Sequence, residues 1–277
     1  MRVLVTGAAG QLGRSLLHAL DQHEVVARTH SQLDLTDADA VRAAVASIAP
    51  DAVVNAAAYN DVDGAESHPE LAEAINVRGP LNLAVATAAT GIAIVHVSTD
   101  YVFDGHINRP YCEDDAPHPL SAYGRSKLAG ERAVIDANPM HFIVRTAWLF
   151  EERGKNFLNS IRALADRSEL RIVADQFGSP TYAPHLARGI ARLIDTDAYG
   201  LYHMAGQGGI SRYDLVRHLF SLLDIGTRLV PINHSEFPAA ATRPLYSVLA
   251  TIRDAEFVLP PWQEGVSAFA GKIRQLT

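Results

Sequence analysis

The feature that most constrains the fold is an apolar run at the start of the chain that enters a helix through a glycine-rich turn. Residues 2–6 read Arg-Val-Leu-Val-Thr, and residues 12–20 carry leucines at helical spacing. Glycines in such a turn allow close approach of the backbone to a pyrophosphate, and the helix N-terminus adds N–H groups with partial positive charge. We therefore predict a dinucleotide-binding turn that contacts its cofactor through Gly7, Gly10, Gln11, Leu12 and Gly13.

The same alternation of apolar and helix-like segments continues through the first half of the chain. Strands are predicted at residues 2–6, 24–28, 52–55, 92–98 and 141–145, and helices at 12–20, 37–48, 70–89 and 122–137. Strands that are apolar throughout indicate a parallel sheet covered on both faces. The predicted fold class is α/β, with a doubly wound parallel sheet of the Rossmann type and its ligand at the carboxyl ends of the strands.

Beyond about residue 150 this rhythm becomes less regular. Residues 175–184 and 231–244 are rich in turn-forming residues and are predicted to be loops. We expect residues 1–150 to form the NAD(P)-binding domain. Residues 151–277 are expected to form mainly a smaller C-terminal substrate-binding lobe, with segments that return to the cofactor domain.

Composition excludes several classes of function. The net charge is −7, and the acidic residues are spread along the chain without a basic block, which argues against nucleic-acid or membrane-surface binding. Cys112 is the only cysteine, so it forms no internal disulfide, and a cytoplasmic location is expected. We find no signal peptide and no apolar window long enough for a membrane helix. The twelve histidines show no metal-ligand spacing, so no metal is expected.

The end of the second predicted strand bears on cofactor choice. An acid about twenty residues after the glycines would bind the ribose hydroxyls of NAD, but no Asp or Glu lies between Val25 and Gln32. Arg28 occupies this region, and a cation there can pair with a 2′-phosphate. NADPH is therefore the expected cofactor. The alternatives are a solvent-facing arginine and NADH.

A tyrosine and a lysine lie one helical turn apart in the segment Tyr123-Gly124-Arg125-Ser126-Lys127. An ordinary phenol has a pKa near 10, and a nearby cation favours its ionised form. We predict that Lys127 lowers the pKa of Tyr123 and binds the nicotinamide ribose, while Tyr123 acts as general acid toward a carbonyl. Thr99 ends a predicted strand upstream and is assigned to hydrogen-bond the carbonyl oxygen.

These motifs, taken together, resemble those of the dTDP-4-dehydrorhamnose reductases, a family of extended short-chain dehydrogenases/reductases. The resemblance runs from end to end. Its most specific segments are Ser-Thr-Asp-Tyr-Val-Phe-Asp-Gly at 98–105, Asp-Gln-Phe-Gly-Ser-Pro-Thr at 175–181 and Arg-Pro-Leu-Tyr-Ser at 243–247. Shared segments also include Gly-Gln-Leu-Gly at 10–13, Asn-Ala-Ala-Ala-Tyr at 55–59 and Gly-Lys-Asn-Phe at 154–157.

The resemblance implies roles for further residues. Near the cofactor it places Asp34 and Leu35 at the adenine, and Ala56, Ala57 and Ala58 at the end of the third strand. At the sugar of the substrate it places Val62, Thr99, Tyr101, Tyr123 and Trp148. At the nucleotide end it places Asn156, Gln176 and Arg243, and it assigns Arg243 to the diphosphate, whose oxygens a guanidinium can pair with in two places.

The implied activity is the last step of dTDP-rhamnose biosynthesis: an oxidoreductase that reduces the C4 ketone of dTDP-6-deoxy-L-lyxo-4-hexulose to dTDP-L-rhamnose. Asn60-Asp61 departs from the family pattern beside the sugar, so reduction of another nucleotide-linked 4-keto-6-deoxyhexose stays open. A third alternative is a non-catalytic subunit similar to the regulatory partner of methionine adenosyltransferase. The acids with which some relatives bind an intersubunit magnesium are not found here. A homodimer is among the expected states.

Overall fold

The computed structural model describes residues 1–276, and its centre is one sheet of six strands in the order β10-β5-β4-β3-β1-β2. Every neighbouring pair in this sheet is parallel. The chain returns from each strand to the next through a crossover, as parallel strands require. The strands are β1 Arg2–Thr6, β2 Glu24–Arg28, β3 Ala52–Asn55, β4 Ala93–Thr99, β5 His141–Thr146 and β10 Gly200–His203.

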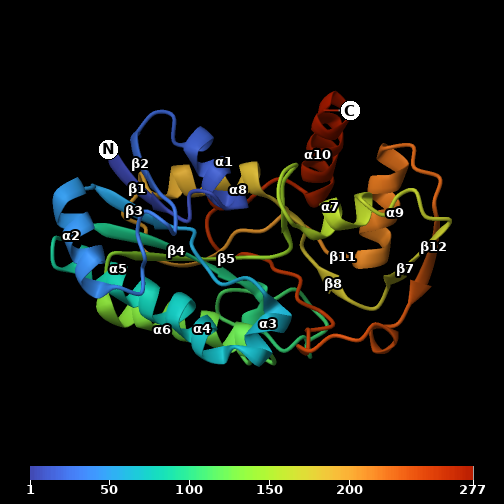
Figure 1. The fold of residues 1–277 in the computed structure, drawn as a ribbon, viewed down its shortest axis with the longest axis horizontal. Helices are drawn as coiled ribbons and strands as arrows, with labels where there is room; N and C mark the ends of the chain where they lie inside the picture. Colours follow the sequence, from blue (N-terminus) through green and yellow to red (C-terminus); the bar gives the residue numbers. More distant parts are fainter. Residues whose placement is uncertain (277) are drawn as a thin grey trace.

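Helices cover both faces of this sheet, as Figure 1 shows. Val3 and Val5 of β1 face a layer formed by α1 (Gln11–Ala19) and α8 (Ala183–Leu193). Leu4, between them, faces the opposite layer, because successive side chains of a strand point to opposite sides. That second layer contains α2 (Ala38–Ile48), α5 (Gly79–Ala88) and α6 (Ala122–Ala137). The predicted α/β fold with a doubly wound parallel sheet is confirmed.

The predicted helix at residues 70–89 is the main error in the first half. The chain forms α3 (Val62–Ser67) and α4 (Pro69–Glu73), then a π-helical turn at Ala74–Arg78 before α5 begins. Pro80 has no N–H to donate to the carbonyl of residue 76, so a regular α-helix cannot run through this point. At this wider turn the N–H of Gly79 donates to the carbonyl of Ala74, one residue further back than in an α-helix.

A second hydrophobic core lies beside the main sheet and is built from later segments, including Phe150, Leu219, Trp262 and Phe269. We propose that this core marks the substrate-binding lobe, with its boundary near residue 150. Its elements are β6 Leu149–Phe150, α7 Phe157–Arg162, β7 Glu169–Val173, β8 Phe177–Gly178, β9 Thr181–Tyr182, β11 Ile210–Ser211, α9 Arg212–Leu222, β12 Arg228–Ile232 and α10 Trp262–Leu276. Three two-stranded sheets pair β6 with β9, β7 with β12 and β8 with β11.

Two predicted loops of the second half contain regular structure. Residues 175–184 include β8, β9 and the first residues of α8, and residues 231–244 begin inside β12. Strands of two residues are too short to show an alternating pattern, so sequence periodicity does not detect them. Both α8 and β10 join the main sheet region although they follow residue 150. No helix within residues 1–276 has the length and apolar content needed to cross a membrane.

The order of the strands locates the ligand-binding edge. β2 lies on one side of β1 and β3 on the other, so the direction of winding reverses between β1 and β3. In open α/β sheets, ligands bind at the carboxyl ends of the strands beside such a reversal. Thr6, Asn55, Thr99 and Thr146 are the last residues of β1, β3, β4 and β5, so they define this edge.

A buried ion pair between α6 and β5 gives a test of the fold. Glu131 accepts hydrogen bonds from Nε and Nη2 of Arg145 at 2.9 and 2.7 Å, and both side chains are at most 4% exposed. Glu131→Gln leaves the guanidinium buried without its counter-charge, so we expect a loss of about 3 to 5 kcal/mol in the free energy of unfolding. Denaturant titration measures this loss. The control is Glu24→Gln in the exposed Arg2–Glu24 pair, which should cost no more than about 1 kcal/mol. Equal losses in the two variants would contradict the assignment.

Candidate active site

The glycine turn after β1 is shaped by contacts that exclude side chains. Gly7 has φ +69°, and a Cβ on it would lie 2.6 Å from the backbone nitrogen of Ala57. A Cβ on Gly13 would lie 2.2 Å from the carbonyl oxygen of Gly7, so α1 packs directly on the turn. Gly10 precedes α1 and provides no side-chain cap. The first N–H groups of α1 therefore stay available for an anion, which fits the pyrophosphate of a dinucleotide.

A buried polar network holds the end of β3 against this turn. The Thr6 hydroxyl donates to Oδ1 of Asn55 at 2.7 Å, and the N–H of Ala57 donates to the same oxygen at 3.1 Å. The N–H of Ala56 donates to the carbonyl of Thr6. Ala56, Ala57 and the following Ala58 thus leave β3 beside the glycine turn, at the position predicted for cofactor contact. The Leu12 side chain lies in the core, so only its backbone faces the turn.

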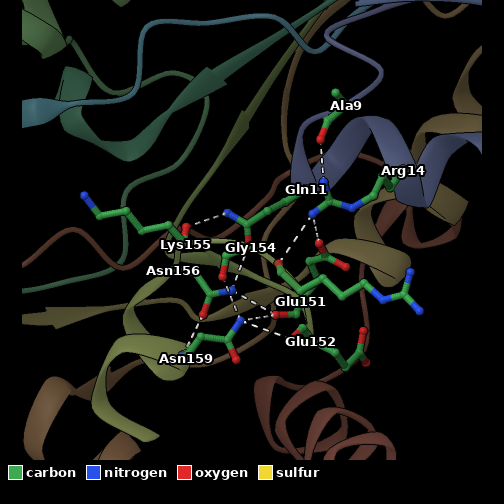
Figure 2. Close-up of polar contacts among 10 residues, drawn as sticks. Ala9, Gln11, Arg14, Glu151, Glu152, Gly154, Lys155, Asn156 and Asn159 are labelled. Atoms are coloured by element: carbon green, nitrogen blue, oxygen red, sulfur yellow. Dashed lines mark hydrogen bonds and ion pairs between the residues drawn. The ribbon is translucent and has the colours of Figure 1, made fainter. Parts of the chain in front are cut away.

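A clasp of polar contacts, drawn in Figure 2, ties residues 151–156 to the glycine turn. Gln11 accepts from Nδ2 of Asn156 at 2.9 Å, and Arg14 forms an ion pair with the buried Glu151. Asn156 also donates to the carbonyl of Glu151 and accepts from the N–H of Asn159, where it caps α7. The structure therefore joins Asn156, which was predicted for the nucleotide end of the substrate, to the cofactor turn.

Arg28 ends β2 directly beside the same turn. It pairs in register with Thr6, and its carbonyl accepts the N–H of Ala8 at 3.2 Å. Its half-buried guanidinium donates to the carbonyl of Ala27, and within residues 1–276 no carboxylate forms an ion pair with it. The side chain is thus free to meet a phosphate.

The two residues predicted to lie at the adenine occupy the next turn. The Asp34 carboxylate accepts from the N–H and the hydroxyl of Thr36, which lowers its pKa. Leu35 is buried in the core, and its carbonyl accepts from Nδ2 of Asn82 at 2.8 Å. Asp34 is exposed, so it is the more accessible of the pair.

The predicted catalytic residues meet where β4 ends against α6. Tyr123 and Lys127 lie on α6, and Thr99 is the last residue of β4; all three are buried. The helix approaches unusually closely, because a Cβ on Gly124 would lie 2.2 Å from the carbonyl oxygen of Tyr101. Nζ of Lys127 donates to the carbonyl of Val97 at 2.7 Å.

The electrostatics of Tyr123 differ from the prediction. Burial raises the pKa of Tyr123 above its ordinary value, and a hydrogen bond with Thr99 partly opposes this rise. The predicted lowering of this pKa by Lys127 is wrong, because burial dominates and the ammonium donates to the Val97 carbonyl instead. Burial also lowers the pKa of Lys127 to about 8, against the opposing charge of Glu131. At neutral pH the phenol is therefore protonated and the lysine is mostly charged.

Residues predicted to contact the sugar gather around this phenol. The ring of Tyr101 meets that of Tyr123 edge to face, with centroids 5.7 Å apart, and Val62 packs in the same cluster. Arg243 reaches Tyr101 from the C-terminal part of the chain and pairs with both carboxylate oxygens of Asp63, at 3.1 and 2.7 Å. The structure thus brings four of the predicted substrate residues together: Val62, Tyr101, Tyr123 and Arg243.

A second group contains a residue that sequence analysis missed. Trp148 has φ +44°, a strained conformation for a bulky residue, and a Cβ on Gly178 would lie 2.3 Å from its ring. Arg212 stacks over this ring with its guanidinium carbon 4.2 Å from the centroid, and its Nε donates to Oε1 of Gln176 at 3.1 Å. Arg212 lies in no motif that we recognised, so only the packing of α9 against Trp148 reveals it.

The sequence of this chain is similar to a known protein family along nearly its whole length. A protein-family model described as the RmlD substrate binding domain matches residues 1–275. A dTDP-4-dehydrorhamnose reductase from Mycolicibacterium smegmatis is 43% identical over 276 residues, which cover 96% of this chain and 84% of the relative.

Solved structures of dTDP-4-dehydrorhamnose reductases are also similar to this chain. A dTDP-4-dehydrorhamnose reductase from Clostridium acetobutylicum superposes with a TM-score of 0.95 at 39% identity, covering 99% of this chain and 100% of that one. The enzyme from Bacillus anthracis in complex with NADP has a TM-score of 0.94 at 38% identity, covering 98% and 99%. The resemblance to the dTDP-4-dehydrorhamnose reductases is therefore confirmed. The chain belongs to the RmlD family, and the relatives described above are dTDP-4-dehydrorhamnose reductases.

Proposed function

We propose that this protein is an NADPH-dependent oxidoreductase that reduces the C4 ketone of dTDP-6-deoxy-L-lyxo-4-hexulose to dTDP-L-rhamnose. One observation carries the proposal: the buried phenol of Tyr123 and the hydroxyl of Thr99 lie together at the carboxyl edge of the sheet. This edge also holds the glycine turn. Relatives that are 39–45% identical over most of their length are named for this reduction.

The chemistry follows from the protonation states. When bound, NADPH supplies the hydride that converts the ketone to an alcohol. Tyr123 is protonated at neutral pH because burial raises its pKa, so it can donate a proton to the carbonyl oxygen as negative charge develops there. Thr99 lies beside the phenol and fixes the same oxygen. We propose that Lys127, whose ammonium is held beside the end of β4, binds the nicotinamide ribose hydroxyls.

The cofactor is proposed to lie along the glycine turn with its 2′-phosphate at Arg28. This arginine is free of a carboxylate partner within the described chain, and the similar enzyme from Bacillus anthracis was solved with NADP. The open N-terminus of α1 would take the pyrophosphate. Gln11 is fixed by the clasp to Asn156, so the turn is held ready for the cofactor.

The substrate is proposed to lie over the two groups of binding residues, which meet at Tyr101 because Arg243 and Arg212 both hydrogen-bond with its phenol. Val62, Tyr101 and Trp148 would contact the sugar, and Gln176, which accepts a hydrogen bond from Arg212, would lie at the nucleotide end. Arg243 would meet the diphosphate, and we add Arg212 as a second cation there. The guanidinium of Arg212 is stacked on Trp148, and burial lowers its pKa. A cation in such surroundings is stabilised by an anionic ligand.

A second candidate is reduction of another dTDP-linked ketosugar. A relative from Streptomyces antibioticus, 42% identical over 97% of this chain, is named a probable dTDP-4,6-dihydroxy-2-methyloxan-3-one 4-ketoreductase. Asn60, where this chain departs from its family, has its Oδ1 3.5 Å from the phenol of Tyr123, so it borders the sugar. Turnover with the two ketosugars compared side by side separates these candidates. A non-catalytic subunit would turn over neither.

We propose a homodimer in the cytoplasm, the latter because the single Cys112 has no disulfide partner in the chain. Light scattering of the purified protein measures the mass in solution.

Replacing the proton donor tests the catalytic assignment. Tyr123→Phe keeps the ring but removes the phenol, so we expect kcat to fall by about two to four orders of magnitude while the Kd for NADPH changes little. Stopped-flow oxidation of NADPH measures the rate, and fluorescence titration measures cofactor affinity. Tyr199→Phe is the control, since Tyr199 packs on the helical layer of α1 and α8 instead. A rate near that of the unaltered enzyme would refute the role of Tyr123.

Reversing the charge at Arg28 tests the cofactor assignment. Arg28→Asp repels the 2′-phosphate and supplies an acceptor for ribose hydroxyls, so the ratio of kcat/KM for NADPH to that for NADH should fall by at least about tenfold. Arg228→Asp makes the same charge change at an exposed position on β12, where Arg228 pairs with Glu169, and should leave the ratio unchanged. If the ratio is unchanged in Arg28→Asp, the 2′-phosphate is bound elsewhere.

A further inference from the structure

Asp100 is a buried carboxylate between two residues of the proposed active site. It follows Thr99 and precedes Tyr101, and only 2% of its surface is exposed. One oxygen accepts the hydroxyl of Thr99 at 3.1 Å, and the other accepts the hydroxyl of Ser247 at 2.5 Å. No ion pair in residues 1–276 includes Asp100. Because a buried carboxylate needs hydrogen bonds in place of water, these two hydroxyls are its main side-chain partners.

Ser247 arrives from a distant part of the chain that also carries Arg243. The N–H of Ser247 donates to the carbonyl of Phe177 at 2.8 Å, which fixes its backbone. The segment 243–247 is pressed against the region after Asp100, since a Cβ on Gly105 would lie 2.9 Å from the backbone nitrogen of Leu245. One short segment thus carries both Arg243, which is proposed for the diphosphate, and Ser247, which contacts Asp100 next to Thr99.

The hydroxyl of Thr99 has a single hydrogen, so it can donate a hydrogen bond to only one acceptor at a time. In this structure Asp100 accepts that hydrogen, and the substrate carbonyl would have to compete for it. A hydrogen bond from Ser247 withdraws charge from the Asp100 carboxylate and weakens its hold on the Thr99 hydrogen. The burial of Asp100, which raises its pKa to about 6, makes such partial neutralisation more favourable.

We infer that a nucleotide diphosphate bound at Arg243 steadies the segment 243–247 and so strengthens the Ser247–Asp100 hydrogen bond, which weakens the hold of Asp100 on the Thr99 hydroxyl and frees it for the substrate carbonyl. Asp100 and Ser247 are thus positioning residues, and this inference rests on the proposed reductase function. Through this bond, binding energy from the non-reacting nucleotide acts at the reacting carbon, which is how remote contacts raise kcat as well as affinity.

Ser247→Ala tests the coupling with two substrates. The first is the dTDP-linked 4-keto-6-deoxyhexose, and the second is the corresponding sugar 1-phosphate, which lacks the nucleoside monophosphate. With the nucleotide sugar we expect kcat to fall about tenfold, as for loss of one hydrogen bond to a charged group, and the Kd for NADPH to stay within about twofold. With the sugar 1-phosphate, the variant and the unaltered enzyme should react at the same slow rate.

Ser179→Ala is the matched control. Ser179 is also fully buried, and its hydroxyl donates to the carbonyl of Gly208 at 3.0 Å and accepts the N–H of Leu249 at 3.2 Å. It therefore holds the same C-terminal stretch without touching Asp100, and its loss should leave kcat within about twofold. Ser247→Cys keeps the shape of the side chain with a somewhat larger atom and weakens the donor. Its loss of kcat should be smaller than that of Ser247→Ala and should again appear only with the nucleotide sugar. If thermal unfolding shows that Ser247→Ala does not fold, Ser247→Cys tests the coupling in its place.

The outcomes separate the inference from the proposed function. If Ser247→Ala behaves like Ser179→Ala, or slows both substrates by the same factor, the coupling is overturned although the enzyme is active. If the unaltered enzyme oxidises no NADPH with the nucleotide sugar, the proposed function fails, and the inference fails with it.

Discussion

The structure depends on the close approach of three backbone segments at the point where the sheet reverses its winding. Gly7 and Gly13 leave no room for side chains between the glycine turn, α1 and the end of β3. Thr6 and Asn55 complete this contact with a buried hydrogen bond. Because the backbone is packed so tightly here, the first N–H groups of α1 face outward at a fixed place. The proposed cofactor position, and with it the proposed place of the reacting carbonyl, depends on this contact.

The second core would supply substrate-binding residues that the Rossmann sheet alone does not provide. Its segments meet the sheet edge at Trp148, which Gly178 and Arg212 hold in a strained backbone conformation. The C-terminal segment returns to the first half of the chain, where Arg243 contacts Asp63 and Tyr101. The proposed site is thus assembled from parts that lie far apart in sequence, and the substrate is expected to bridge the two halves.

Much of this arrangement could be predicted from the sequence, for reasons that are local. The strands at residues 2–6, 24–28 and 52–55 have bounds that match the structure, because apolar β-branched runs between polar turns define them well. Tyr123 and Lys127 share a helix, so their proximity follows from spacing. The orientation of Lys127 toward the Val97 carbonyl and the bond between Asn156 and Gln11 depend on tertiary packing. The same holds for Arg212, whose neighbours Trp148 and Gln176 come from other segments.

The most direct test of the account is to follow NADPH oxidation with the 4-keto sugar nucleotide made from dTDP-glucose by a dehydratase and an epimerase, and to identify the product. The account predicts that NADPH is consumed in equal amount to ketone and that dTDP-L-rhamnose is formed. Absence of oxidation with both NADPH and NADH, in protein shown to bind the cofactor, would contradict the assigned reaction. The fold and the cofactor site would then still stand, and another ketosugar or a partner protein would be sought.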